Sequence, residues 1–113
     1  MINIYDTANQ MEQDLRKTEQ YQDLERAYAE LKSDEEAFEC FKAIHSLTDE
    51  LQKKQMSGQQ VTEDDVRKLQ DLGKKADGYE KLQMLMQKEQ ALNMMMDELS
   101  KIIFRPLREI YKD

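Results

Sequence analysis

Residues 79–111, YEKLQMLMQKEQALNMMMDELSKIIFRPLREIY, carry the spacing that decides the fold. Seam positions recur along this stretch at alternating intervals of three and four residues: Leu82, Leu85, Glu89, Leu92, Met96, Leu99, Ile103, Pro106 and Ile110. This heptad spacing keeps one stripe of a helix against a neighbouring helix, and Met86, Met95 and Ile102 widen the stripe. The pattern predicts a helix over 79–105, roughly 40 Å long, along which the preceding helices lie.

The composition fits one folded domain with a small core. The chain has 113 residues, of which 39% are apolar and 36% charged, and it lacks Trp. We expect a single helical domain over 1–113 whose apolar stripes are partly covered by a second chain. A net charge of −7 disfavours nucleic acid and membranes as partners and favours proteins.

The cysteine count and the N-terminal sequence predict a soluble, cytoplasmic protein. Cys40 is the only cysteine, which excludes an intrachain disulfide and suits a reducing compartment. Residues 1–6, MINIYD, lack the basic and apolar regions of a signal peptide. No apolar run is long enough to span a membrane.

Helix start and stop signals recur in the first half of the chain, and strand signals are absent. A first helix is expected over 4–16, and Thr18 caps a second helix. Ser33 and Glu36 predict a Ser-x-x-Glu capping box for a third helix, which stops at Gly58. The fold class expected is all-α, an antiparallel bundle of about five helices with a long C-terminal helix, assembled as a dimer.

The third and fourth helices are expected to form an antiparallel hairpin. The aromatic face of the third helix should be the densest part of the core, in an apolar line of Phe38, Phe41, Ile44, Leu47 and Leu51. Thr62 and Asp65 predict a capping box for the fourth helix, and Val61 and Val66 predict a hydrophobic staple. The face expected to pack back onto the third helix consists of Val66, Leu69, Leu72 and Ala76.

Glycine and proline predict two interruptions near the C-terminus. Gly73 and Gly78 bracket a short segment across which the heptad phase is lost, so the sequence indicates either a kink or a break near Asp77. Pro106 is expected to interrupt the last helix near Arg105, and one more turn follows it.

Residues that could carry chemistry are few. His45 is the lone histidine, and no second metal ligand lies one helical turn away, so we interpret it as partly packed. Cys40 beside the core face is interpreted as a small apolar residue. The carboxylates at 34–36 and 63–65 occupy first helical turns, where capping accounts for them. No catalytic, cofactor-binding or metal-binding residue is therefore predicted.

Two readings remain open for the methionine-rich seam. Met94, Met95 and Met96 point about 100° apart, which indicates either a helix buried on several sides in its own bundle or an adaptable surface for a second subunit or another protein. We favour a dimer interface, because thin helical layers associate to cover apolar area. The interface candidates are Leu82, Leu85, Met86, Glu89, Leu92, Met95, Met96, Leu99 and Ile103. Glu89, a charge within the seam, is hypothesised to set register or partner choice.

A basic stripe follows the methionines, formed by Lys101, Arg105, Arg108 and Lys112 if helical phase survives Pro106. Cations near a helix C-terminus ordinarily complement its dipole. The alternative is a docking strip for an acidic partner or RNA.

Three stretches carry a family resemblance: residues 3–6 (NIYD) leading to Leu15-Arg16, residues 52–59 (QKKQMSGQ) and residues 101–107 (KIIFRPL). Together they resemble the YheA branch of the bacterial YlbF/YmcA-like proteins nearly end to end. The resemblance implies an all-helical, usually dimeric protein of low-GC Gram-positive bacteria. It also implies a regulatory role without enzymatic activity. Relatives associate with one another and with a further protein, influence an endoribonuclease that processes messenger RNA, and affect competence, sporulation and biofilm formation.

Some relatives carry cysteines linked to an iron–sulfur cluster. Because this chain has only Cys40, no cofactor is expected. The function expected is a non-enzymatic, cytoplasmic protein–protein interaction or regulatory module that works as a homodimer. The alternative is an RNA-associated accessory factor that uses the basic stripe, and an enzyme ranks third because no nucleophile–base pair is visible.

Overall fold

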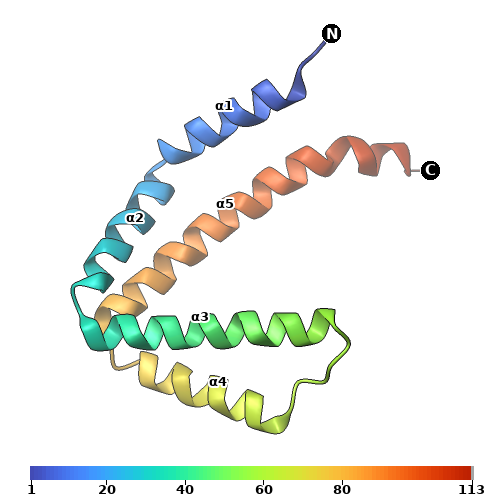
Figure 1. Cartoon of the computed structure of the whole chain (residues 1–113). Helices are drawn as coiled ribbons and strands as arrows, with labels where there is room; N and C mark the ends of the chain where they lie inside the picture. The colour runs from blue at the N-terminus through green and yellow to red at the C-terminus, as the bar shows by residue number, and fades with distance from the viewer. Residues whose placement is uncertain (113) are drawn as a thin grey trace. The chain divides into compact units, whose positions relative to one another are not determined.

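A computed structural model describes residues 1–112 of the chain. It contains five helices, α1 (Ile4–Arg16), α2 (Glu19–Lys32), α3 (Glu35–Met56), α4 (Glu63–Ala76) and α5 (Glu80–Ile110), shown in Figure 1. No strand occurs within residues 1–112. The all-α fold with a long C-terminal helix is therefore confirmed.

The chain divides into two compact units. The first contains Met1–Arg26 together with the chain from Met86 on, and the second is Ala27–Leu85. The helices α2 and α5 each contribute residues to both units. The first unit has little core of its own, since α1 buries no residue fully and only Met11 and Leu15 of its apolar line are half-buried.

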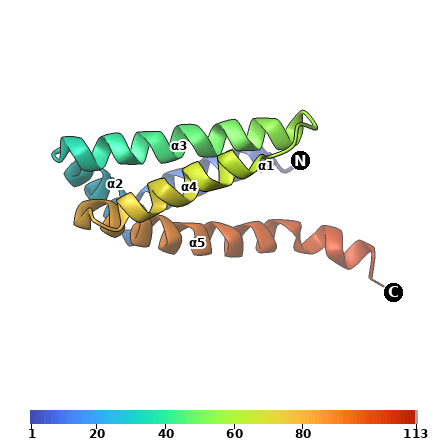
Figure 2. The ribbon, with the colours of Figure 1, turned by 90° about the horizontal axis from the view of Figure 1, so that it is seen from below.

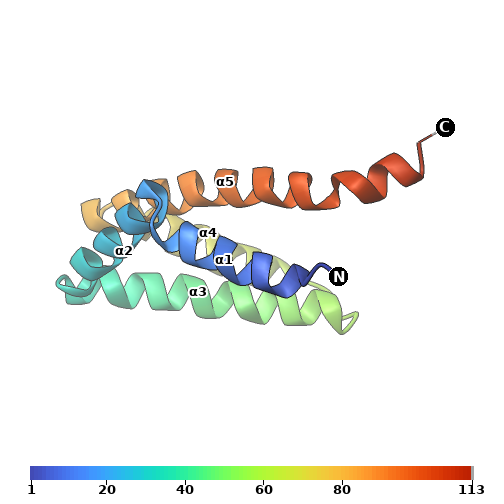
Figure 3. The ribbon, with the colours of Figure 1, turned by 90° about the horizontal axis from the view of Figure 1, so that it is seen from above.

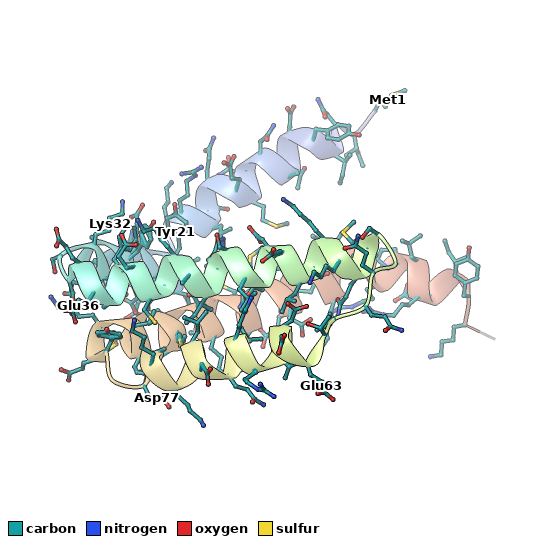
Figure 4. The ribbon with its side chains drawn as sticks, turned by 60° about the horizontal axis from the view of Figure 1, so that its bottom comes forward. Met1, Tyr21, Lys32, Glu36, Glu63 and Asp77 are labelled. Carbon is teal, nitrogen blue, oxygen red and sulfur yellow. The ribbon has the colours of Figure 1, made fainter. Side chains whose placement is uncertain are left out.

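The second unit holds the core of the protein. Its α3 and α4 pack antiparallel, side by side, as Figure 2 shows and as Figure 4 shows with Glu63 and Asp77 at the two ends of α4. Buried apolar residues come from four helices: Ala27, Leu31, Ala37, Cys40, Leu47, Ala76, Leu82 and Leu85. On α3 they follow heptad spacing, which explains why α3 presents one stripe to its neighbours.

The aromatic residues of α3 do not form the densest part of the core, contrary to the sequence prediction. Phe38 and Phe41 are only half-buried, whereas Ala37 and Cys40, one position earlier, are buried. One residue corresponds to about 100° around a helix, so the buried stripe and the aromatic stripe are distinct faces. Small side chains allow α3 to approach its neighbours closely, and the rings lie beside that contact.

The glycine turn and the capping box of the α3–α4 connection are as the sequence predicts. Gly58 has a φ of 79°, a left-handed conformation that glycine adopts without a Cβ clash. The capping box is present, because the Asp65 N–H donates to Thr62 Oγ1 (3.1 Å) and the Thr62 N–H donates to Asp65 Oδ2 (3.1 Å). Lys54 Nζ also donates to Asp65 Oδ2 at 2.7 Å, which ties α3 to the start of α4.

Asp65 is the one buried charged residue within residues 1–112. Two hydrogen bonds lower the pKa of Asp65 to about 2. The larger contribution comes from the Lys54 ammonium and the next from the backbone N–H of Thr62. The same ion pair raises the pKa of Lys54. Both shifts favour the charged forms, so burial of this carboxylate is compensated by its donors.

The capping box predicted from Ser33 and Glu36 is wrong by one residue. The N-cap of α3 is Asp34, whose side chain accepts from the Ala37 N–H at 3.3 Å. The Ser33 hydroxyl instead donates to the Glu30 carbonyl at 2.6 Å and accepts from Lys81 Nζ at 2.8 Å. Ser33 therefore belongs to the end of α2, and Figure 4 labels Lys32 and Glu36 on either side of this short connection.

The heptad phase is lost at a break between α4 and α5. Gly73 lies within α4, and the chain leaves helical geometry over 77–79 before α5 begins. The predicted contact face of α4 is only partly used, because Ala76 is buried and Leu72 half-buried while Val66 and Leu69 are exposed. The α3–α4 contact is therefore narrow towards the start of α4.

Pro106 does not interrupt α5, contrary to the sequence prediction. The helix continues to Ile110, and Figure 3 shows α5 as an unbroken ribbon up to its end. Proline removes one backbone hydrogen bond and crowds the preceding turn, which loosens the carbonyls there. Arg108 Nη2 donates to the Lys101 carbonyl at 2.7 Å, next to the Ile102 carbonyl whose usual helical donor Pro106 lacks.

Candidate functional site

The C-terminal part of α5 exposes a continuous apolar surface. Every residue of the segment 101–112 is exposed. Five large apolar residues in the helical part of this segment, which ends at Ile110, are each more than 50% exposed: Ile102, Ile103, Phe104, Leu107 and Ile110. We call these five the C-terminal apolar surface. Because scattered apolar residues are normal on proteins but contiguous ones indicate a binding face, this is the strongest candidate for an interaction site.

The residues of this segment separate into two faces of the helix. At about 100° per residue, Ile103, Leu107 and Ile110 fall within an arc of roughly 60°. Lys101, Arg105 and Arg108 fall within a similar arc on the opposite side. The segment is therefore amphipathic, with an apolar face and a basic face.

The helical phase of the basic stripe survives Pro106, since α5 extends to Ile110, while Lys112 follows the end of the helix. Lys101 Nζ pairs with Asp97 Oδ2 at 3.2 Å, both side chains being 65% exposed. Exposed pairs of this kind contribute little to stability. The stripe is thus solvated and reachable by a partner.

The interface candidates divide into three groups along α5. Leu82 and Leu85 are buried in the core of the second unit, so they are covered by the chain itself. Glu89, Leu92, Met95 and Leu99 are half-buried, whereas Met86, Met96 and Ile103 are exposed. Burial therefore falls along the seam, and exposure is greatest towards its C-terminal end.

The interface predicted from the sequence ends at Ile103 and leaves out Phe104, Leu107 and Ile110. The heptad spacing continues through Pro106 to Ile110, so it is the signal that points to Ile110. Phe104 and Leu107 lie off the seam, and heptad spacing does not identify them.

A second cluster lies in the second unit, beside the core stripe of α3, with half-buried aromatic rings and an exposed histidine. Tyr28 contacts Phe38 and Phe41 edge-on, with centroids 6.0 and 5.8 Å apart, and His45 stacks on Phe41 at 5.7 Å. With Lys42, these residues line a shallow groove of about 390 Å³. The spacing of Phe38, Phe41 and His45, at three and then four residues, was the signal for this separate face.

The single thiol of the chain has a structural partner. The Cys40 thiol is buried and lies 3.9 Å from the Leu72 carbonyl oxygen. Within residues 1–112, no group of three or more His, Cys, Asp or Glu side chains is placed to hold a metal ion. In that same part of the chain, no helix combines the length and apolar character needed to cross a membrane.

Known proteins match the chain over nearly its whole length. A family model described as "Control of competence regulator ComK, YlbF/YmcA" matches residues 4–108. A UPF0342 protein of Lacticaseibacillus paracasei is 46% identical over 112 residues, covering 99% of this chain and 98% of that protein. A UPF0342 protein of Lactiplantibacillus plantarum is 40% identical over 112 residues, with 99% and 98% coverage.

Two solved structures share the fold. A protein of unknown function (DUF964) from Bacillus stearothermophilus has a TM-score of 0.83 and 32% identity, covering 97% of this chain and 96% of that one. The yheA protein from Bacillus subtilis has a TM-score of 0.74 and 31% identity, covering 97% and 100%. The chain therefore belongs to the YlbF/YmcA family of proteins described as controlling the competence regulator ComK, and within it to the YheA-like proteins.

Proposed function

We propose that this chain is a non-enzymatic, cytoplasmic regulatory module that acts through protein–protein contacts and works as a homodimer. The observation that supports this proposal is the C-terminal apolar surface, which lies exposed on a helix with heptad spacing. Heptad seams are stable when a second helix covers them. Covering this surface would remove five exposed apolar side chains from water.

The family description supports a regulatory role. It links the family to control of the competence regulator ComK. For this chain we infer that any effect on competence, biofilm formation or RNA processing is transmitted by binding other proteins. The chemistry-bearing side chains support the non-enzymatic reading, because the carboxylates of Asp34 and Asp65 cap helices and Cys40 is buried.

Sedimentation of matched charge variants tests the interaction module. Ile103→Asp places a carboxylate on the C-terminal apolar surface, and Met94→Asp places the same group on the opposite side of α5, where Met94 is also exposed. We expect a wild-type dimer, a dissociation constant at least tenfold higher for Ile103→Asp, and no change for Met94→Asp. Burying an unpaired carboxylate in an interface is costly, which is the basis for this difference.

Circular dichroism of both variants provides the folding control, because each should retain the helical content of the wild type. A wild-type chain that stays monomeric at hundreds of micromolar would contradict the homodimer. Equal association of Ile103→Asp and Met94→Asp would contradict the choice of surface.

The alternative function is an RNA-associated accessory factor. The continuity of α5 through Pro106 favours it, because Lys101, Arg105 and Arg108 then share one face. Gel shifts with single-stranded RNA at two salt concentrations test it, using the wild type and a variant in which these three residues and Lys112 are neutralised. RNA binding that weakens with salt and disappears in the variant would support this alternative.

A further inference from the structure

We propose that two copies of the chain pair through α5 in an antiparallel orientation and in one register, with the two-fold axis passing between residues 97 and 98. This inference rests on the proposed function and names the geometry of its interface. It places Leu92 opposite Ile103 of the second copy, and Met96 opposite Leu99 of the second copy. Each pair then occurs twice, as two-fold symmetry requires.

The seam positions favour this register. The seam of each helix alternates between two kinds of position, and in an antiparallel pair each kind faces the other kind on the partner. Because the two chains run in opposite directions, the numbers of any two facing seam residues add up to the same sum. The central partners, Met96, Leu99, Leu92 and Ile103, are all apolar and are half-buried or exposed in the single chain. At the ends of the seam, Glu89 faces Pro106 of the second copy and meets no second charge.

The positions that flank the seam provide the independent argument. On one flank Lys88 faces Glu109 of the second copy, and Met95 faces Ile102. On the other flank Asn93 faces Ser100 and Met86 faces Leu107. At these positions a positive charge therefore faces a negative charge, apolar residues face apolar residues, and small polar residues face each other. Flanking positions of this type set partner choice and orientation in helix pairs.

Other arrangements lose this complementarity. A parallel pair in register would place Glu89 against Glu89 of the second copy inside the seam, where like charges repel. An antiparallel pair shifted by one heptad towards the C-terminus would place Glu109 against Met95 and Asn93 against Leu107. A shift in the other direction would require Leu85, which is already buried in its own chain.

The surroundings of Lys88 are compatible with a second acidic partner. Lys88 Nζ lies 3.7 Å from Asp23 Oδ2, and its side chain is 36% exposed. Asp23 also pairs with Arg26 and is not dependent on Lys88 alone. The ammonium carries three donors, so it can donate to the Glu109 carboxylate of a second copy while remaining beside Asp23.

Mixing charge-reversed chains tests the register. Lys88→Glu and Glu109→Lys each create two like-charge pairs in their own homodimers, which should weaken association by roughly five- to tenfold. An equimolar mixture of the two variants forms heterodimers in which both pairs are again opposite in charge. We expect the mixture to recover wild-type association in sedimentation and to show mainly heterodimers by native mass spectrometry.

The control mixture combines Lys88→Glu with Glu98→Lys. Residue 98 lies outside the seam, so Glu98→Lys alone should associate like the wild type, and its heterodimer with Lys88→Glu keeps one like-charge pair and should not be favoured. Preferred heterodimers in the control mixture as well, or no recovery in the first mixture, would overturn the register.

Spin labels test the orientation directly. In a Cys40→Ala background, labels at Arg108→Cys should lie roughly 32 Å apart along the helix axes, because residue 108 faces residue 87 of the second copy at 1.5 Å per residue. Labels at Glu98→Cys should be almost level, because residue 98 faces residue 97. Similar distances at both sites would show a parallel pair. A dimer with that result would contradict only the orientation, whereas a monomer would contradict the proposed function itself.

Discussion

The α3–α4 hairpin and the C-terminal part of α5 carry the same heptad spacing but differ in what covers it. In the hairpin the stripe of α3 is buried through Ala37, Cys40 and Leu47, and Lys54 pairs with Asp65 across the two helices. On α5 the spacing continues to Ile110, yet Ile103 and Ile110 are exposed. Heptad spacing therefore indicates that a helix packs against a neighbouring helix. It does not indicate whether that neighbour belongs to the same chain.

The largest expected effect compares one buried and one exposed apolar residue of α5. Leu82→Ala should destabilise the chain by about 2–5 kcal/mol, because Leu82 is fully buried and the substitution leaves a cavity. Met94→Ala, at an exposed position off the seam, should change the free energy of unfolding by less than about 0.5 kcal/mol. Urea denaturation of both variants measures this difference. Equal losses would show that the two parts of α5 do not differ as described.

The capping box of α4 tests how far the hairpin depends on local signals. Thr62→Ala removes the acceptor of the Asp65 N–H and should destabilise the chain by about 1 kcal/mol. Thr62→Ser retains the hydroxyl and serves as the control. Thermal unfolding followed by circular dichroism compares the variants, and a Thr62→Ala protein as stable as Thr62→Ser would show that the box contributes nothing.

Replacing the proline of α5 sharpens the description of the C-terminal apolar surface. Pro106→Ala restores a backbone hydrogen bond to the last turns and should stabilise them by up to about 1 kcal/mol, less than the ~3 kcal/mol of a mid-helix proline. Amide hydrogen exchange should slow at residues 106–110 and remain unchanged in α3. Unchanged exchange in the last turns would mean that Pro106 does not loosen this end of α5.

The smallest effect is confined to acid pH and concerns the ion pair of the hairpin. The folded pKa of Asp65 is about 2, below its unfolded value of about 3.9, so its contacts stabilise the hairpin fully above the unfolded pKa. This contribution is lost as the pH falls from about 4 towards 2. Asp65→Asn should therefore show a flatter stability curve over that range than the exposed control Asp64→Asn. Parallel curves for the two variants would contradict the assignment.

The sequence predicts helix bounds and caps well where the contacts that set them lie within a few residues. The first helix was predicted over 4–16 and occurs there, and Thr62 and Asp65 form the predicted box. Ser33 and Asp34 are both good caps, and Asp34 is the one used, while the Ser33 hydroxyl accepts from Lys81, which is distant in sequence. No local pattern contains that contact.

Burial was predicted less well than helices. The sequence predicts that the large aromatic residues of α3 lie in the core, but a close approach of helices favours small side chains. Ala37 and Cys40 are therefore buried, and Phe38 and Phe41 lie beside them, half-buried. Pro106 predicts an interruption that the uninterrupted spacing around it does not. The extent of the interface depends on which signal holds, because a continuous helix lets Ile110 continue the seam and places Leu107 beside it.

The burial of the single thiol gives the chain a built-in reporter of its own opening. Cys40 is enclosed where α3 meets α4, with its sulfur directed at the Leu72 carbonyl. A thiol reagent can react with it only during moments when those two helices part. The rate of labelling in unmodified protein therefore measures how often the hairpin separates, and any ligand or partner that holds the hairpin closed will slow that rate.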